Sequence, residues 1–129
     1  MSLKMFLDAN FLIYLNLGEP NVESLFERLL EKQPFYTDVL VLEETFYISK
    51  KKYGVKYEDS ADFVKEVILP CSRVLKIGIE DFNVSLQFLD KLKPSDALHV
   101  AAMKNNGIST IISEDEGFDK IKHIKRVWI

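Results

Sequence analysis

Four acidic residues in this 129-residue chain adjoin apolar segments, where a charged side chain is costly to place. They are Asp8, Glu44, Asp96 and Asp115. Carboxylates gathered at the rim of a core repel one another, by roughly 3 kcal/mol for a pair ~6 Å apart at an effective dielectric of about 20. A fold that brings four of them together usually does so to hold divalent cations, which points to phosphoryl-transfer chemistry.

Oxygen ligands with open coordination positions suit hard cations, Mg²⁺ or Mn²⁺, which keep waters and bind substrate phosphate. One such cation could lower the pKa of a bound water, and a second could stabilise a leaving oxygen. The implied reaction is hydrolysis of a phosphodiester. Taken singly, each acid also has an ordinary structural interpretation: Asp96 as a helix-start acid, Glu44 as a solvated helix residue, and Asp8 and Asp115 as loop caps.

Hydrophobic periodicity and stop signals predict the elements that must position these acids. Strands are expected over residues 3–7, 73–78, 109–113 and 126–129. Helices are expected over residues 11–17, 21–30, 39–53, 58–69, 80–92 and 94–106. Residues 39–42 could equally be a strand, but the apolar pattern continues through Ile48 without a turn signal, which favours a helix.

Several residues are expected to begin, end or orient these helices. Gly54 is a good helix stop, and Pro70 is expected to close the helix over 58–69. Phe82, Leu86 and Leu89 are expected to face inward from the helix over 80–92. The predicted N-caps are Asn10, Asn21, Thr37 or Asp38, and Ser95.

Strands alternating with helices indicate a three-layer α/β/α domain with a mainly parallel central sheet. No linker is visible, so residues 1–129 are expected to form one domain. Ligands bind beyond the carboxyl ends of the strands in such sheets. Asp8 directly follows the first strand, and Asp115 lies two residues beyond the strand that ends at Ser113. The two acids therefore meet at one edge if those strands are central neighbours.

The bulk properties exclude some classes and leave others open. The net charge of −3 looks wrong for a nucleic-acid binder, but the four acids carry −4 of it, so the rest of the chain carries +1. No apolar run approaches the ~20 residues that cross a bilayer, and the N-terminus lacks the layout of a secretory signal. A single cysteine, Cys71, cannot form an internal disulfide and fits a reducing compartment. A cytoplasmic protein without a membrane partner is expected.

Four segments, in this order, make the chain resemble a PIN-domain ribonuclease of the VapC-like toxin branch. They are Phe6-Leu7-Asp8-Ala9-Asn10-Phe11-Leu12-Ile13, the stretch from Val39 through Glu44, Pro94-Ser95-Asp96-Ala97-Leu98-His99-Val100-Ala101-Ala102, and Ile111-Ile112-Ser113-Glu114-Asp115-Glu116-Gly117-Phe118-Asp119. The resemblance covers essentially the whole chain. It implies a PIN-like fold and a metal-dependent endoribonuclease that acts on single-stranded RNA. The same resemblance implies that the protein is the toxin of a type II toxin–antitoxin pair, with an antitoxin as its partner, and that it forms a homodimer.

Carried over by position, the resemblance implies that Asp8, Glu44, Asp96 and Asp115 are the metal-site and catalytic acids. Glu43 adjoins Glu44, and Glu44 is preferred because the acid in this branch usually follows a triplet such as Val41-Leu42-Glu43. Asp119 is a supporting acid or replaces Asp115. The family often has Thr after the first acid, whereas this chain has Ala9 and so lacks that hydroxyl.

Other polar residues near these acids keep two interpretations. Asn10 can orient a metal ligand or cap a helix, and Ser113 can bond to a metal-bound water or end a strand. His99 lies one helical turn past Asp96 and could be a general base, but a buried, hydrogen-bonded histidine is favoured. Lys50-Lys51-Lys52 ends a helix and could also follow an RNA backbone.

Two rival functions compete with the ribonuclease hypothesis. A PIN-like fold can serve as a non-catalytic RNA- or protein-binding module, although such a module need not keep four acids. A receiver-like or phosphatase-like α/β domain also has an acidic pocket at strand ends. A receiver, however, needs paired acids near its first strand and a lysine where this chain has Glu114-Asp115.

Overall fold

A five-stranded parallel sheet forms the centre of the protein, which a computed structural model describes over residues 3–129. The strands are β1 (Met5–Leu7), β2 (Phe35–Asp38), β3 (Ser72–Leu75), β4 (Thr110–Ile112) and β5 (Lys125–Val127). Their spatial order is β3-β2-β1-β4-β5, and every neighbouring pair is parallel. The predicted parallel α/β/α architecture is confirmed.

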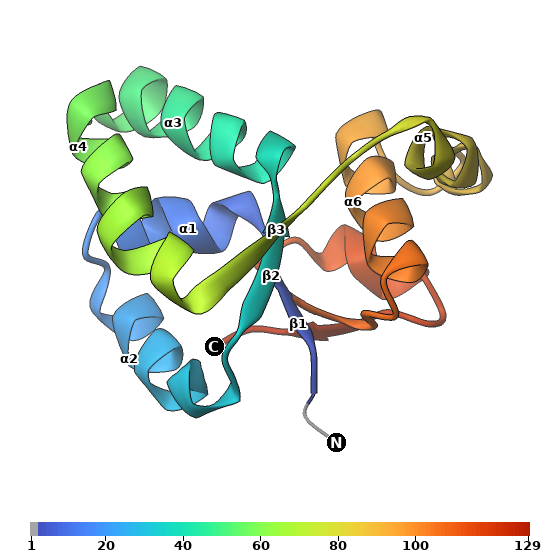
Figure 1. The fold of residues 1–129 in the computed structure, drawn as a ribbon, viewed down its shortest axis with the longest axis horizontal. Coiled ribbons are helices and arrows are strands. Elements are labelled where there is room, and N and C mark those ends of the chain that lie inside the picture. Colours follow the sequence, from blue (N-terminus) through green and yellow to red (C-terminus); the bar gives the residue numbers. More distant parts are fainter. Residues whose placement is uncertain (1–2) are drawn as a thin grey trace.

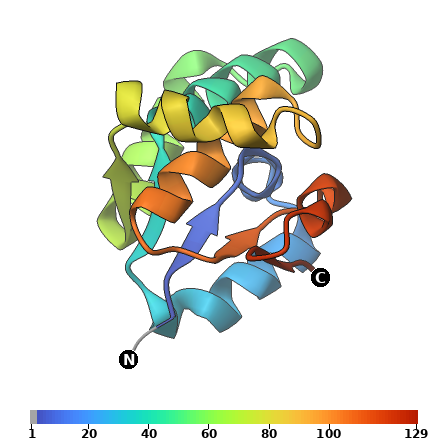
Figure 2. The same cartoon turned by 90° about the vertical axis from the view of Figure 1, so that its right-hand side faces the viewer.

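Helices cover both faces of this sheet. One face carries α1 (Ala9–Asn16), α2 (Pro20–Leu29), α3 (Val39–Tyr53) and α4 (Tyr57–Phe63), and the other carries α5 (Ile79–Ser85) and α6 (Pro94–Asn105) (Figure 1). Figure 2 shows α6 lying across its face of the sheet, with α5 packed beside α6 near the upper ends of the strands. Short helical turns complete the chain: η1 (Leu30–Lys32), η2 (Val64–Ile68), η3 (Leu69–Cys71), η4 (Leu86–Phe88) and η5 (Glu116–Lys120). Within residues 3–129, no helix is both long and apolar enough to cross a membrane.

The strand order reverses between β1 and β4. The chain builds β1, β2 and β3 outward in one direction, then returns to the other side of β1 for β4 and β5. Leu7 is in register with Ile112, and the Asp8 N–H donates to the Ile112 carbonyl at 3.1 Å. Ligand sites in open α/β sheets lie at such reversal points, outside the carboxyl ends of the strands. The condition under which Asp8 and Asp115 meet at one edge, that these two strands are central neighbours, is therefore met.

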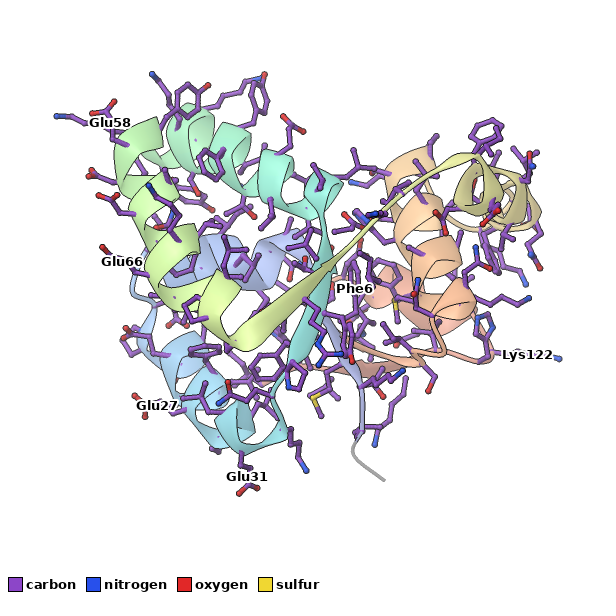
Figure 3. The ribbon with its side chains drawn as sticks, viewed as in Figure 1. Phe6, Glu27, Glu31, Glu58, Glu66 and Lys122 are labelled. Atoms are coloured by element: carbon purple, nitrogen blue, oxygen red, sulfur yellow. The ribbon has the colours of Figure 1, made fainter. Side chains whose placement is uncertain are left out.

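Two central strands and the small apolar side chains of α6 make up much of the core. Phe6, at the middle of β1, is fully buried and lies at the centre of the molecule in Figure 3. Ala97, Val100 and Ala101 of α6 are also fully buried, which brings the helix backbone close to the sheet. This close approach holds the first turn of α6 near the end of β1.

Three predicted N-caps were wrong by two residues each. Asp8, and not Asn10, caps α1, because its Oδ1 accepts from the Ala9 N–H at 2.9 Å. Glu19 caps α2 in place of Asn21, and Lys93 occupies the N-cap position of α6 in place of Ser95. Proline is the first residue of α2 and of α6, where its fixed φ suits a helix, so the residue before each proline is the N-cap.

The α3 prediction, in contrast, matches the structure at both ends. Asp38 is the N-cap, with its Oδ1 accepting from the Val41 N–H at 2.9 Å. Gly54 ends the helix in the left-handed conformation, with a φ of 72° that favours glycine. Strand β2, which runs directly into this helix, was missed. It has only four residues, and Pro34 just before it gave the appearance of a loop.

The expected inward face of the helix over 80–92 was wrong. Phe82, Leu86 and Leu89 are 49%, 50% and 45% exposed, whereas Asp81 and Ser85 are buried. Asp81 accepts hydrogen bonds from the Gly78 N–H and from Asn105 of α6, so polar contacts turn this face inward. The helix over 58–69 also ends early, because α4 passes into a π-helical turn at Val64 and then a 3₁₀ turn that contains Pro70.

Candidate metal centre

A pocket of about 280 Å³ opens at the reversal point between β1 and β4. All four acids singled out in the sequence line it. Its lining also includes polar, basic and apolar side chains from α1, α3 and the start of α6: Asn10, Ile13, Tyr14, Ile48, Lys52, Tyr53 and Lys93. The structure therefore brings together residues that are up to 107 positions apart in the chain, from Asp8 to Asp115.

Asp8 is the most firmly held of the four acids. It is 4% exposed, and its Oδ2 accepts from the Ser113 hydroxyl at 2.7 Å and from the Asn10 amide at 3.3 Å. Asn10 also donates to the Ser113 Oγ at 3.0 Å and accepts from the Glu114 N–H at 3.0 Å. Asn10 and Ser113 thus fix the carboxylate at the end of β1 to the segment that follows β4.

Asp96 approaches Asp8 from the first turn of α6. Ligand atoms of Asp8, Asp96 and His99 all lie within 4.8 Å of one another. Burial raises the pKa of Asp8, and burial together with the charge of Asp8 raises the pKa of Asp96 to about 6. The positive charge of Lys93 lowers the pKa of Asp96 and so partly offsets this rise. The two neighbouring carboxylates are costly to ionise together because they repel each other in a buried site. A bound cation would remove this repulsion, so the pair is suited to hold one.

His99 is buried and paired with Asp38. Its Nδ1 lies 2.6 Å from Asp38 Oδ2, and the Asp38 side chain is fully buried. Burial acts to lower the pKa of His99, but the hydrogen bond and charge of Asp38, with the charges of Asp8 and Asp96, raise it overall. The sequence suggested a buried, hydrogen-bonded histidine, but Asp38 was recognised only as a helix cap. Its position at the carboxyl end of β2 was the missed signal.

Glu44 and Asp115 lie farther out in the same pocket. Glu44 is partly exposed on α3, and Asp115 is exposed and caps η5 through the Gly117 N–H at 2.8 Å. In the described part of the chain, neither belongs to the close group of Asp8, Asp96 and His99. Asp115 nevertheless lies near enough for its charge to raise the pKa of both Asp8 and Asp96.

Glu43 and Asp119, the alternatives to Glu44 and Asp115 as metal ligands, do not line this pocket. Glu43 lines a separate surface hollow with Phe46, Tyr47 and Tyr57. Asp119 pairs with Arg126, at 3.0 Å from Oδ1 to Nε and 3.2 Å from Oδ2 to Nη2. Arg126 in turn donates to the Ser113 carbonyl at 3.2 Å, so Asp119 contacts the site only through this arginine.

Positive charge and aromatic rings lie at the open side of the pocket. Lys52, Tyr53 and Lys93 line it directly. The lysines at the end of α3 lie over exposed tyrosine rings, with Lys50 4.4 Å from the centroid of Tyr57 and Lys52 5.5 Å from that of Tyr53. Other lysines lie far from the pocket, such as Lys122, which projects outward beyond α6 in Figure 3.

Comparison with known proteins places this arrangement in a family. Residues 5–124 match the PIN domain family, and the chain belongs to that family. It is 30% identical to ribonuclease VapC13 of Mycobacterium tuberculosis over 130 residues, which is 93% of this chain and 96% of the relative.

Solved structures share the fold at lower identity. The chain is similar to the toxin VapC20 of Mycobacterium tuberculosis, described as cleaving the sarcin-ricin loop, with a TM-score of 0.72 and 19% identity over 90% of this chain and 93% of that one. It is also similar to a chain of a toxin–antitoxin complex from Klebsiella pneumoniae, with a TM-score of 0.71 and 17% identity over 94% of this chain and 95% of that one.

Proposed function

We propose that this protein is a metal-dependent endoribonuclease that hydrolyses phosphodiester bonds of single-stranded RNA and acts as the toxin of a toxin–antitoxin pair. The observation that carries the proposal is the pocket itself. Asp8, Glu44, Asp96 and Asp115 all line one cavity at the carboxyl ends of the central strands. Membership of the PIN domain family and the similarity to VapC13, which is named a ribonuclease, support the same activity.

The donor set fits Mg²⁺ or Mn²⁺. Asp8 and Asp96 would supply buried carboxylate oxygens, with Glu44 and Asp115 reaching the ion directly or through water. A bound cation would stabilise the negative charge that develops on the phosphate as a Lewis acid, and would lower the pKa of a water bound to it. Asn10 and Ser113 hold the Asp8 carboxylate in one orientation, which spares the site the cost of ordering it when substrate arrives.

Substrate binding is assigned to the basic and aromatic side of the pocket. Lys93 and Lys52, which line the pocket with the acids, would meet phosphate oxygens of the bound strand. Tyr53, 39% exposed, offers a ring on which an unpaired base can stack, and stacking of this kind favours single strands over duplex. These roles explain how a chain with a net charge of −3 could still bind RNA.

An antitoxin or second copy of the chain has a suitable surface away from the pocket. Phe82 of α5 and Leu86 of η4 are about half exposed, and Ile79 is 69% exposed. Phe82 also borders an apolar hollow with Val39, Leu40, Ile77 and Leu98. Exposed apolar patches of this kind are typical of protein interfaces. Size measurement of the purified protein, alone and with the product of the adjacent reading frame, tests both partners.

The activity is tested with purified protein, a labelled single-stranded RNA and Mn²⁺. Asp8→Asn and Asp96→Asn should each slow cleavage at least about a hundredfold, because a catalytic cation contributes several kcal/mol to the transition state. Asp62→Asn, an exposed change on α4, is the matched control and should cleave at the parental rate. Equal cleavage by all four proteins would overturn the proposal. Metal binding without cleavage of varied RNAs would favour the non-catalytic binding module.

A further inference from the structure

We infer that His99 is a nitrogen ligand of the cation held by Asp8 and Asp96, and that Asp38 positions its ring for this purpose. The inference rests on the proposed metal site, and adds to it an imidazole that an all-carboxylate centre would lack. It makes the site a mixed nitrogen and oxygen centre, with Asp38 outside it as the partner of the ligand.

The distances carry the first step. A ligand nitrogen of His99 and carboxylate oxygens of Asp8 and Asp96 lie within 4.8 Å of one another. Ligands about 2.1–2.2 Å from an ion in octahedral geometry stand about 3 Å apart when adjacent and about 4.4 Å apart when opposite. Three donors at most 4.8 Å from one another have a common centre within about 2.8 Å of each, so each donor needs to move by at most about 0.6 Å to share one ion.

The orientation of the ring carries the second step. Nδ1 is bonded to Asp38 at 2.6 Å, which leaves Nε2 as the ring nitrogen free to meet a cation. Asp38 cannot easily turn away, because its other oxygen caps α3 through the Val41 N–H at 2.9 Å. The Phe6 ring packs beside the imidazole, with centroids 5.7 Å apart.

This arrangement matches the way that proteins present histidine to metals. A ligating imidazole almost always bonds through its second nitrogen to a carboxylate or carbonyl, which fixes the tautomer and the direction of the ring. Asp38, His99 and the acid pair form that series in this structure, and His99 is only 3% exposed. A histidine serving only to pack the core would not need to lie within ligand distance of two carboxylates.

An imidazole ligand also changes which cation the site prefers. Imidazole suits Zn²⁺, Fe²⁺ and Ni²⁺ best. Of the two cations proposed for this site, Mn²⁺ accepts a nitrogen ligand more readily than Mg²⁺, which favours an all-oxygen shell. The inference therefore predicts that Mn²⁺ binds more tightly than Mg²⁺, and that this preference depends on His99.

The chain contains two histidines, which makes a direct spectroscopic test possible. With Mn²⁺ bound to the full-length protein, pulsed electron paramagnetic resonance should detect coupling to ¹⁴N, and labelling histidine with ¹⁵N should change that coupling. His99→Gln should abolish the coupling. His123→Gln is the matched control and should keep it, because His123 is exposed and packs beside Phe88.

Affinity measurements supply the second readout. By titration calorimetry, His99→Gln and Asp38→Asn should weaken Mn²⁺ binding about tenfold or more and Mg²⁺ binding much less. Absence of histidine nitrogen coupling in the parent protein, or absence of Mn²⁺ binding, would overturn the inference, and neither result depends on a variant that folds. Nitrogen coupling without RNA cleavage would leave this inference standing while the proposed activity fails. Metal-dependent cleavage without nitrogen coupling would support the proposed activity and overturn this inference.

Discussion

The floor and the rim of the pocket are built in different ways. The floor consists of Asp8 and Asp96, which line the pocket, together with His99 and Ser113, which contact or lie close to these acids; all four are buried. The rim consists of Glu44, Lys52, Tyr53, Lys93 and Asp115, all at least partly exposed. Charges on the floor are in a low-dielectric environment and interact strongly, whereas those on the rim are screened by water and salt. The floor is therefore suited to hold an ion and the rim to hold a flexible strand.

The largest expected effect lies in the floor, where function and stability should oppose each other. Asp96→Asn should stabilise the cation-free protein at pH 7 by up to about 2 kcal/mol. At this pH the Asp96 carboxylate is ionised in the unfolded chain, and folding places that charge in a site where its pKa is raised, which costs free energy. Asparagine carries no charge and avoids this cost. Folding stability of the parent protein should fall as the pH rises from about 4 to about 6, and remain low above that. Urea unfolding across this pH range, in the presence of a chelator, measures both effects.

A pH dependence that is the same in Asp96→Asn and in the parent protein would contradict this account of the floor. Saturating Mn²⁺ should reverse the order of the two proteins, since the parent gains about 2.7 kcal/mol at a cation concentration 100 times its Kd.

The next effect concerns the support of the floor. Ser113→Ala removes the hydroxyl that donates to Asp8 at 2.7 Å and accepts from the Asp115 N–H at 3.0 Å. RNA cleavage should fall about tenfold, as is common when a residue that orients a metal ligand is lost. Ser109→Ala, an exposed change at the other end of β4, is the control and should leave the rate unchanged. Parental activity in Ser113→Ala would show that the floor does not depend on this bond.

Smaller effects are expected at the rim. Lys52→Ala and Lys93→Ala should each weaken RNA binding a few-fold and reduce the slope of log affinity against log salt by about 0.7, as for one phosphate contact on a single strand. Binding is measured in the Asp8→Asn background so that the RNA stays intact. Lys122→Ala is the control and should change neither quantity. Loss of affinity that does not vary with salt would assign these lysines to packing instead.

The smallest effect is expected at the edge of the rim. Tyr14 donates to Glu114 at 2.8 Å, and this hydrogen bond raises the pKa of Tyr14 to about 12. Glu114→Gln should lower the pKa of Tyr14 towards its usual value and change stability by less than about 0.5 kcal/mol. Titration followed by nuclear magnetic resonance of the tyrosine ring measures the shift. A large loss of stability would mean that the rim is as rigid as the floor.

Sequence reasoning predicted the location of the floor acids better than their surroundings. Asp8 follows a buried strand and Asp96 opens an apolar helix, so general rules for parallel sheets were enough to bring them to one edge. The Asp38–His99 pair was not predicted because its members are 61 residues apart and meet only after β2 joins the sheet. Periodicity carries no information about such a tertiary contact.

The limits of the fold prediction have a similar cause. The inward face of the helix expected over residues 80–92 was misassigned because Phe82, Leu86 and Leu89 have the spacing of a buried stripe. The side that faces inward instead carries Asp81 and Ser85, and Asp81 is bonded there to Gly78 and Asn105. A periodic pattern shows that a helix has an apolar face, but it does not show whether that face meets the core or a partner.

Asp38 joins two parts of the molecule that are usually independent. One of its oxygens fixes the first turn of α3 and the other fixes the ring of His99. The 15 residues of α3 run from this cap to the end that carries Lys52 and Tyr53, so one helix connects the buried acid–histidine pair to the rim of the pocket. Asp38 therefore sets two orientations with one side chain: that of the helix bearing part of the rim, and that of the imidazole beside the floor acids.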